Sequence, residues 1–149
     1  MYLRSSKKIL QHVEDIVHDK TQVHEKSIDL TVDSVYRFTQ PGALDFGGSE
    51  FEPAATEIIE PQKENSNDDY GWWKLDRGYY KAVFNEHISL DEDMLAIIAP
   101  HDHARQAGLL TNTALLAHGD TSILTFQVPE MGCNIKENAR IATAYLLYI

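Results

Sequence analysis

The chain has 149 residues, an apolar fraction of 43% and a formal net charge of −10, which together predict one globular domain with a core of its own. So acidic a composition argues against a nucleic-acid polymer as partner, because phosphate backbones are bound by basic surfaces. No apolar run approaches the ~18 residues of a membrane span, and the first residues lack the apolar core of a signal peptide. A single cysteine excludes an internal disulfide. We therefore expect a cytoplasmic protein with no membrane partner.

The N-terminal third changes from a helical to a strand-like pattern. Apolar residues recur at helical spacing in residues 6–17, which predicts a short N-terminal helix. Residues 27–38 then tend towards the alternation of a β-strand, and the pair Ser34-Val35 breaks it in the way that a β-bulge does. Gln40-Pro41-Gly42 ends this strand, because proline removes an amide donor and glycine permits a turn.

Residues 43–71 are poor in apolar side chains, apart from a candidate strand at residues 56–59. Paired glycines, acidic residues and amides dominate this segment, which predicts a partly mobile insertion. The acidic residues of the chain concentrate here and in residues 86–93. We expect both acidic stretches to lie in solvated loops or turns.

A series of short predicted strands follows this segment. Their spacing is typical of a mainly β fold, either a sandwich or a barrel. The predicted strands are residues 72–75, 79–84, 94–99, 109–116, 122–128 and 140–149.

Three segments, in this order, carry a resemblance to a known family. The first is S-I-D-L at residues 27–30, followed by V-Y-R-F at residues 35–38. The second is a glycine turn, a strand, an acidic turn and an apolar strand over residues 78–100, and the third is R-I-A at residues 140–142. Together they resemble the dCTP deaminase/dUTPase superfamily across nearly the whole chain.

The resemblance implies a fold, an assembly and an activity. The fold is a distorted β-barrel or jelly-roll, formed here by residues 1–149 as a single dUTPase-like domain. The assembly is a homotrimer with a small nucleotide bound between subunits and Mg²⁺ as the cofactor. The activity is that of a dCTP deaminase or a dUTP diphosphatase, which places the chain in deoxyribonucleotide metabolism.

The family's phosphate-binding motif, G-R-S-S or P-R-S-S, is replaced here. Alignment on Pro100 and Gly108 places His101 at the arginine, and Asp102 and His103 at the serines. Arginine is a permanent five-donor cation, whereas histidine has at most two donors and is mostly neutral at pH 7. The resemblance nevertheless indicates a ligand-binding set, which comprises Asp29, His101, Asp102, His103, Arg105 and Arg140.

The catalytic residues of the family are not matched either. Thr125 stands where the deaminase has its catalytic glutamate, and threonine is no general base near neutral pH. The candidate catalytic acids are therefore Asp102 and Asp120. Family dUTPases also close a glycine-rich tail over the phosphates, and we expect no such tail after Ile149. These changes predict weak or absent turnover of dCTP and dUTP.

Several alternatives remain open at this level. Asp29 is either a carboxylate that binds a metal-bound water or a structural residue at a strand bend. On an extended segment, His101 and His103 would face one side and could bind a transition metal with His118, or they pack at a subunit interface. The alternative functions are therefore a non-catalytic nucleotide-binding or regulatory trimer and a metal-binding trimer.

Overall fold

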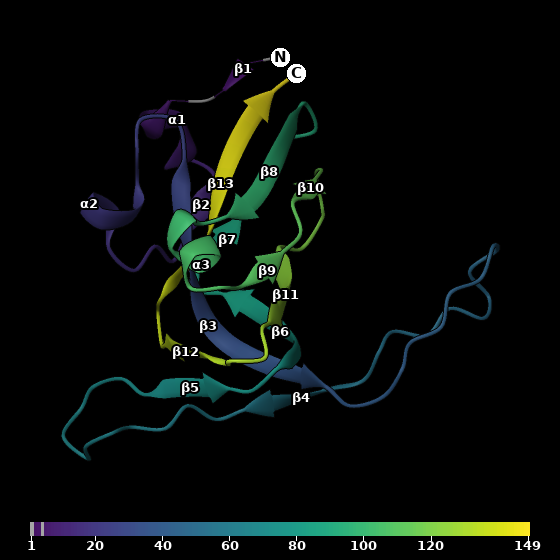
Figure 1. Ribbon diagram of the computed structural model, residues 1–149. Helices are drawn as coiled ribbons and strands as arrows, with labels where there is room; N and C mark the ends of the chain where they lie inside the picture. Colours follow the sequence, from purple (N-terminus) through teal and green to yellow (C-terminus); the bar gives the residue numbers. More distant parts are fainter. Residues whose placement is uncertain (1, 4) are drawn as a thin grey trace.

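The protein is a curled β-sheet with two short N-terminal helices at its left and a third near the middle of the view, as Figure 1 shows for the described residues. The structure is a computed structural model that describes residues 2, 3 and 5–149, with side chains for residue 5 and from residue 7 onward. The main sheet runs in the order β10 (Ala114–Leu116), β8 (Met94–Pro100), β13 (Arg140–Tyr148), β3 (Ile28–Phe38), β6 (Gly78–Phe84), β11 (Ile123–Val128) and β9 (Leu110–Thr111). Strand β1 (Tyr2–Leu3) pairs with β13, and β4 (Thr56–Ile59) pairs with β3.

Smaller elements complete the fold. Strand β12 (Cys133–Lys136) pairs with β5 (Trp72–Leu75), and β2 (Val13–Glu14) pairs with β7 (His87–Ile88). The helices are α1 (Ser6–Ile9), α2 (Asp19–Gln22) and α3 (Asp102–Gln106). None of the helices in the described residues is long and apolar enough to cross a membrane. The prediction of a mainly β, dUTPase-like fold with a short N-terminal helix is confirmed.

The N-terminal helix is shorter than the pattern of residues 6–17 predicts. It ends at Ile9, and Val13 already pairs with Ile88 in the next strand pair. Asp15 has a φ of 61°, a left-handed conformation that an α-helix does not continue through. The apolar residues of the segment do not share one buried face, since Leu10 and Val17 are about half exposed.

The predicted irregularity in the first long strand is confirmed. The register between β3 and β6 shifts between Val32 and Ser34, which is the signature of a β-bulge. Before the shift, every residue from Ile28 to Val32 is buried, and after it Val35 is the one buried residue of the strand. The buried half of β3 therefore carries polar residues, Asp29 and Thr31, into the interior of the molecule.

Much of the core lies on one face of the sheet. Strands β6 and β11 alternate strictly, and their inward side chains are Tyr80, Ala82, Phe84, Leu124, Phe126 and Val128. The aromatic pair Tyr80 and Phe126 stacks with ring centroids 5.7 Å apart. Each fully buried large apolar side chain of this kind contributes roughly 1.5–3 kcal/mol to stability.

Residues 39–55 form a two-stranded arm that projects away from the sheet, to the right in Figure 1. Ala43 and Glu52 exchange backbone hydrogen bonds of 2.9 and 3.0 Å, and the Thr39 amide donates to Ala55. Near the tip, Leu44 and Phe46 are 91% and 109% exposed. The segment therefore has backbone pairing but almost no core contact, and its mobility stays a prediction.

Candidate functional site

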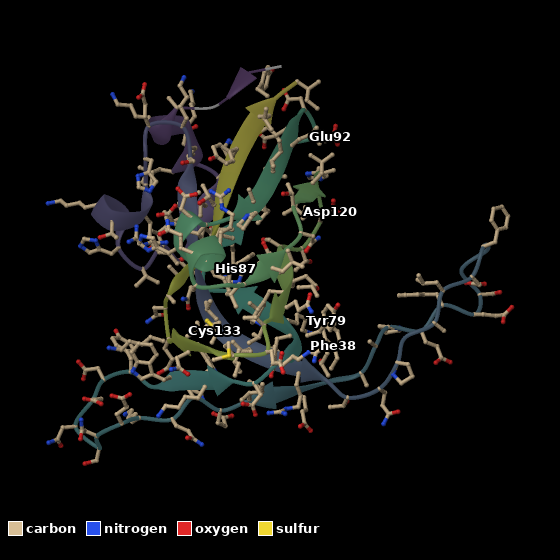
Figure 2. The ribbon with its side chains drawn as sticks, viewed as in Figure 1. Phe38, Tyr79, His87, Glu92, Asp120 and Cys133 are labelled. Carbon is tan, nitrogen blue, oxygen red and sulfur yellow. The ribbon has the colours of Figure 1, made fainter. Side chains whose placement is uncertain are left out.

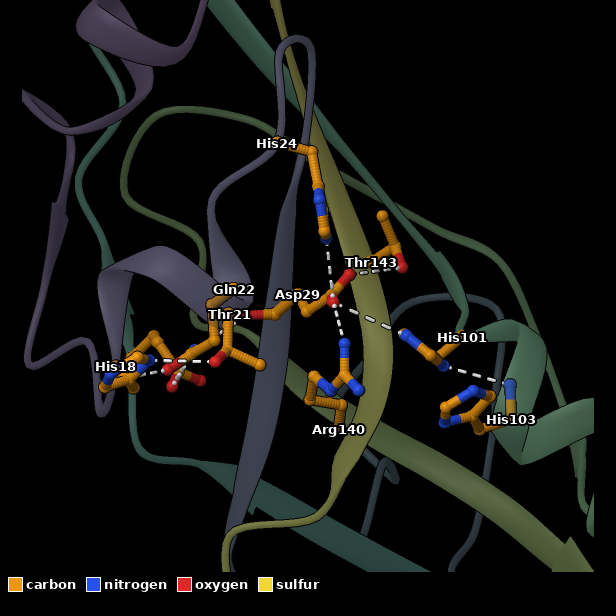
Figure 3. A network of polar contacts seen from close by, with 10 residues as sticks. His18, Thr21, Gln22, His24, Asp29, His101, His103, Arg140 and Thr143 are labelled. Carbon is orange, nitrogen blue, oxygen red and sulfur yellow. Dashed lines mark hydrogen bonds and ion pairs between the residues drawn. The ribbon is translucent and has the colours of Figure 1, made fainter.

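The polar residues predicted to bind a ligand converge on the carboxylate of Asp29. Strand β3 carries Asp29, its neighbour β13 carries Arg140 and Thr143, and His101 follows the end of β8. The register of β13 with β3 places Thr143 opposite Asp29. Figure 3 shows these side chains pointing towards the carboxylate, together with His24 from the loop after α2. We call Asp29, His24, His101, Arg140 and Thr143 the Asp29 cluster.

Protein donors surround both oxygens of the Asp29 carboxylate, whose side chain is 3% exposed. Oδ2 accepts from Nε2 of His24 at 3.0 Å and from Nη1 of Arg140 at 3.1 Å. Oδ1 accepts from the hydroxyl of Thr143 at 3.2 Å, and Nε2 of His101 lies 3.4 Å from Oδ2. A buried carboxylate is tolerated where it is paired and hydrogen-bonded in this way.

The orientation of the His101 ring follows from the start of helix α3. The backbone amide of His103 donates to Nδ1 of His101 at 2.9 Å, so His101 caps the helix with its side chain. Nδ1 is then the acceptor, and the proton of the neutral ring belongs on Nε2, which faces Asp29. The exposed ring of His103 packs edge-on against His101, with centroids 4.7 Å apart. Segment 102–106 is thus helical rather than extended.

The pKa values of the cluster move in the direction that keeps Asp29 ionised and His101 neutral. Burial alone would raise the pKa of Asp29, but hydrogen bonds from His24 and Arg140, together with the charges of His101 and His24, lower it. Burial lowers the pKa of His101, and the attraction of Asp29 offsets only part of that effect. Around neutral pH the pair is therefore a carboxylate next to an uncharged imidazole.

A second buried polar network holds this arrangement in place. The carboxylate of Glu86 accepts from the Thr31 amide at 2.7 Å, from the Thr31 hydroxyl at 2.6 Å and from Nε2 of Gln22 at 2.9 Å. Gln22 also donates to the backbone carbonyl of Asp29 at 2.9 Å. Glu86, Gln22 and Thr31 are each 2% exposed, so this network fixes α2, and with it the loop of His24, against β3.

This network was not predicted from the sequence, and the expected position of Glu86 was wrong. Glu86 begins an acidic stretch expected to be solvated, but it is buried. Gln22 lies in the polar run D-K-T-Q-V-H-E-K, which gives no sign of burial. A carboxylate and an amide that pair over 64 residues of sequence leave no local pattern.

The remaining predicted site residues lie around the cluster or away from it. Asp102 and Arg105 pair with each other on the exposed side of α3, and both line a cavity of about 550 Å³ in front of Asp29. Asp120 lies in an exposed turn, where it accepts from the Ala117 amide at 2.8 Å. Figure 2 shows Asp120 at the edge of the molecule, so of the two candidate acids only Asp102 borders the cavity.

The structure does not assemble the predicted three-histidine metal site. Nδ1 of His118 donates to the carbonyl of Leu90 at 2.6 Å, whereas His101 and His103 are held together at the start of α3. Within the described part of the chain, no group of three or more His, Cys, Asp or Glu side chains is placed to hold a metal ion. The prediction fails because His118 follows strand β10, on the far side of β8 from the cluster.

The Asp29 cluster also fits poorly with a Mg²⁺ ion bound directly to Asp29. Such an ion is usually bound through one or two carboxylates plus substrate phosphates. Here both oxygens of Asp29 already accept hydrogen bonds, and the guanidinium of Arg140 lies 3.1 Å from Oδ2. A dication could not reach Oδ2 without displacing that cation.

Thr125 lies on the opposite side of the sheet from the core. It is exposed on β11 and stands directly across from Lys81 of β6. It borders a second cavity of about 550 Å³ together with Tyr79 and Leu110, two exposed apolar side chains. We call the exposed side chains Phe38, Ile58, Tyr79, Leu110, Ile123 and Thr125 the outer sheet face.

Comparison with known proteins agrees with this architecture. No protein-family model matches the chain. A probable deoxyuridine 5'-triphosphate nucleotidohydrolase of Archaeoglobus fulgidus is 30% identical over 134 residues, which cover 87% of this chain and 74% of that protein. A protein of the same description from Methanosarcina mazei is 29% identical over 133 residues, with the same coverage of both chains.

The fold is also similar to a solved structure. A crystal structure of 2'-deoxycytidine 5'-triphosphate deaminase from Agrobacterium tumefaciens superposes with a TM-score of 0.69 at 13% identity. The match covers 99% of this chain but only 48% of the deaminase, so the chain spans about half of that protein's length. The curated relatives point to deoxyribonucleotide metabolism, and the shared fold agrees with them. The chain belongs to the dCTP deaminase/dUTPase superfamily.

Proposed function

We propose that this protein binds a deoxyribonucleoside triphosphate at the Asp29 cluster and turns over dUTP or dCTP weakly or not at all. The proposal rests on the carboxylate of Asp29, whose two oxygens already accept hydrogen bonds from His24, Arg140 and Thr143. A carboxylate held in this way neutralises Arg140 and orients two imidazoles. It is not free to serve as a base or to receive a metal ion.

The cavity in front of the cluster supports an anionic ligand. Its volume of about 550 Å³ lies within the range of small-molecule sites. The guanidinium of Arg105 borders it, and a guanidinium is a suitable partner for phosphate oxygens. The rings of His24 and His101 border it as well, each with its Nε2 directed at Asp29. The resemblance implies a triphosphate in this region, where Arg105 supplies donors although the substituted motif has lost the fixed charge of the family's arginine.

Weak turnover follows from the groups that the site lacks. Thr125 stands where the deaminase has a general base, and loss of such a base costs about 10²–10⁴ in rate. The Asp29 cluster offers no carboxylate oxygen free of protein donors. Loss of fixed charge at the phosphates lowers the rate further, because preorganised charge stabilises the transition state.

We also propose that the nucleotide site is completed in a homotrimer. The outer sheet face supports this, because it exposes Tyr79, Leu110 and Ile123 at 61%, 67% and 45% on one side of a continuous sheet. Exposed apolar patches of this kind mark protein interfaces. Thr125 lies in the same face, so assembly would bring the Thr125 cavity against a second subunit.

Ligand-induced stabilisation followed by a turnover assay tests the proposal. At a dUTP or dCTP concentration of about 100 Kd, binding adds ~2.7 kcal/mol, which raises Tm by about 5–11 °C for a chain of this size. We expect this rise both with Mg²⁺ and with a chelator. Arg105→Gln, which removes the guanidinium that borders the cavity and breaks an exposed pair with Asp102, should remove most of it, whereas Arg37→Gln, which breaks an exposed pair with Glu57, should not.

The turnover assay separates a binding protein from an enzyme. With Mg²⁺ present, we expect turnover far below ~1 s⁻¹, which is the lower end of the ordinary enzyme range. A turnover number at or above that value, lost in the His101→Ala, Asp102→Ala double variant, would show that the replaced motif is a working active site. Absence of any nucleotide-induced stabilisation would refute binding itself.

A further inference from the structure

A separate pocket lies between helix α3 and the β5–β12 strand pair. Its volume is about 220 Å³. Ala104 and Ala107 of α3 line this pocket, whereas Asp102 and Arg105 of the same helix line the cavity in front of Asp29. We call it the Trp72 pocket, after the half-buried indole contributed by β5.

The lining of the Trp72 pocket has an unusual charge. The chain carries 23 acidic residues against 13 Lys and Arg, yet no acidic residue is among the described residues that line this pocket. The polar lining consists of His103, Asn134, Lys136 and Arg140, all of which can donate hydrogen bonds. A pocket that excludes carboxylates and gathers donors in so acidic a protein favours an anion.

Apart from those polar groups, the walls are mainly apolar. Leu109, Ile135 and Ile141 are buried core residues that also line the pocket, and Trp72 supplies an aromatic surface. A cavity of about 150 Å³ with apolar walls is large enough for benzene. A volume of about 220 Å³ therefore accommodates one aromatic ring with a small substituent and excludes a whole nucleotide.

Lys136 is the cation best placed to receive the charged substituent. Its Nζ lies 5.5 Å from the centroid of the Trp72 ring, which is within the range of a cation–π contact. No carboxylate among the described residues forms an ion pair with it. Arg140, by contrast, already bonds Asp29 through Nη1.

We propose that the Trp72 pocket binds a single-ring aromatic anion, with the ring against Trp72 and Leu109 and the charged group at Lys136. The site is distinct from the nucleotide cavity and does not depend on the proposed function. A carboxylate and a phosphate ester satisfy the same chemistry, so the test includes benzoate and phenyl phosphate as separate probes.

Cys133 lines the same pocket and is the only cysteine in the sequence. Its rate of alkylation by iodoacetamide, followed by intact mass, therefore reports occupancy of this pocket or of the neighbouring cavity that Cys133 also lines with Lys74, and the lysine variants below separate the two. Burial raises the pKa of the Cys133 thiol, so the reaction is run at mildly alkaline pH. We expect benzoate, phenyl phosphate or both to slow alkylation in a saturable manner. Benzamidine, a cation of the same shape, should not.

Two lysine variants give the matched comparison, with affinities from calorimetry and alkylation. Lys136→Gln should weaken benzoate or phenyl phosphate binding about tenfold, the low end for loss of a charge-assisted hydrogen bond. Lys74→Gln removes the same charge from the same strand pair outside the pocket and should leave the affinity unchanged. Both positions are exposed, so neither substitution should prevent folding.

Three results would overturn the proposal. The first is that neither anion slows Cys133 alkylation at any concentration up to the low millimolar range. The second is that benzamidine protects Cys133 as well as benzoate does. The third is an equal loss of affinity in the Lys136→Gln and Lys74→Gln variants, which would reduce the effect to general electrostatics.

Discussion

Replacement of Glu86 by alanine tests whether a buried carboxylate stabilises the candidate site. Glu86 is 2% exposed and accepts three hydrogen bonds from two residues, Thr31 and Gln22. Glu86→Ala removes every acceptor at once. The Thr31 amide, the Thr31 hydroxyl proton and one N–H of Gln22 then lose their acceptors, while the second N–H of Gln22 still reaches the carbonyl of Asp29.

The cost can be worked out from these contacts. Each buried donor left without a partner costs about 1–3 kcal/mol, and the lost side-chain volume leaves a small cavity that adds to this. In the wild type, burial of the carboxylate carries a desolvation cost. The substitution removes that cost, which offsets part of the loss. We therefore expect Glu86→Ala to lower the free energy of unfolding by about 3–5 kcal/mol, equivalent to a fall in Tm of roughly 6–20 °C.

Urea unfolding at one fixed protein concentration measures this loss, because assembly would make stability depend on concentration. Glu92→Ala is the matched control, since it removes an exposed acid from the same acidic stretch and should change stability by less than ~0.5 kcal/mol. If Glu86→Ala fell within about 1 kcal/mol of Glu92→Ala, the network would contribute little and our account of how α2 is anchored would be wrong.

Three further predictions concern pH, assembly and proteolysis. Folding lowers the pKa of His101 below its ordinary value of 6.5 and the pKa of Asp29 below its ordinary value of 3.8. The free energy of unfolding should therefore fall as the pH drops from 6.5 through the folded pKa of His101, and fall again below 3.8 because of Asp29. His101→Gln should flatten the first decline, as measured by urea unfolding between neutral and mildly acidic pH. Leu110→Asp, on the outer sheet face, should convert the proposed trimer to monomer in sedimentation, and a wild-type monomer at micromolar concentration would remove the basis for a site between subunits. Limited proteolysis should cut first within residues 43–71, and primary cleavage within residues 79–99 would mean that the mobile segment has been misplaced.

The strands were predictable because their burial follows a local rule. In β6 and β11, inward and outward residues alternate without exception, and a period of two in the sequence records this directly. The bulge in β3 was predictable for the same reason, because Ser34-Val35 interrupts the alternation where the register shifts. Strand β12 was missed because C-N-I-K contains Asn and Lys, which strands disfavour, whereas the equally short β5 contains two tryptophans, which strands favour.

The site was only partly predictable, and the missing part is non-local. Asp29, His101 and Arg140 were found through the resemblance, which indicates where a family places its ligand. His24 and Thr143 complete the cluster, yet nothing adjacent to them in the sequence indicates that they meet Asp29. The metal hypothesis failed similarly, since the sequence shows three histidines near one another and cannot show that His118 turns towards Leu90.

Protonation of His101 has opposite effects on anion binding and on the stability of the fold at acid pH. At neutral pH the Asp29 cluster pairs one carboxylate with one guanidinium, and the imidazole of His101 adds no fixed charge. Protonation of His101 would strengthen binding of an anion, but burial of the ring makes that protonation costly and destabilises the fold. A bound phosphate chain would offset this cost, because a negative charge near the ring favours its protonated form. Binding of an anion should therefore be coupled to proton uptake through His101, whereas an arginine at that position would carry its charge at every pH.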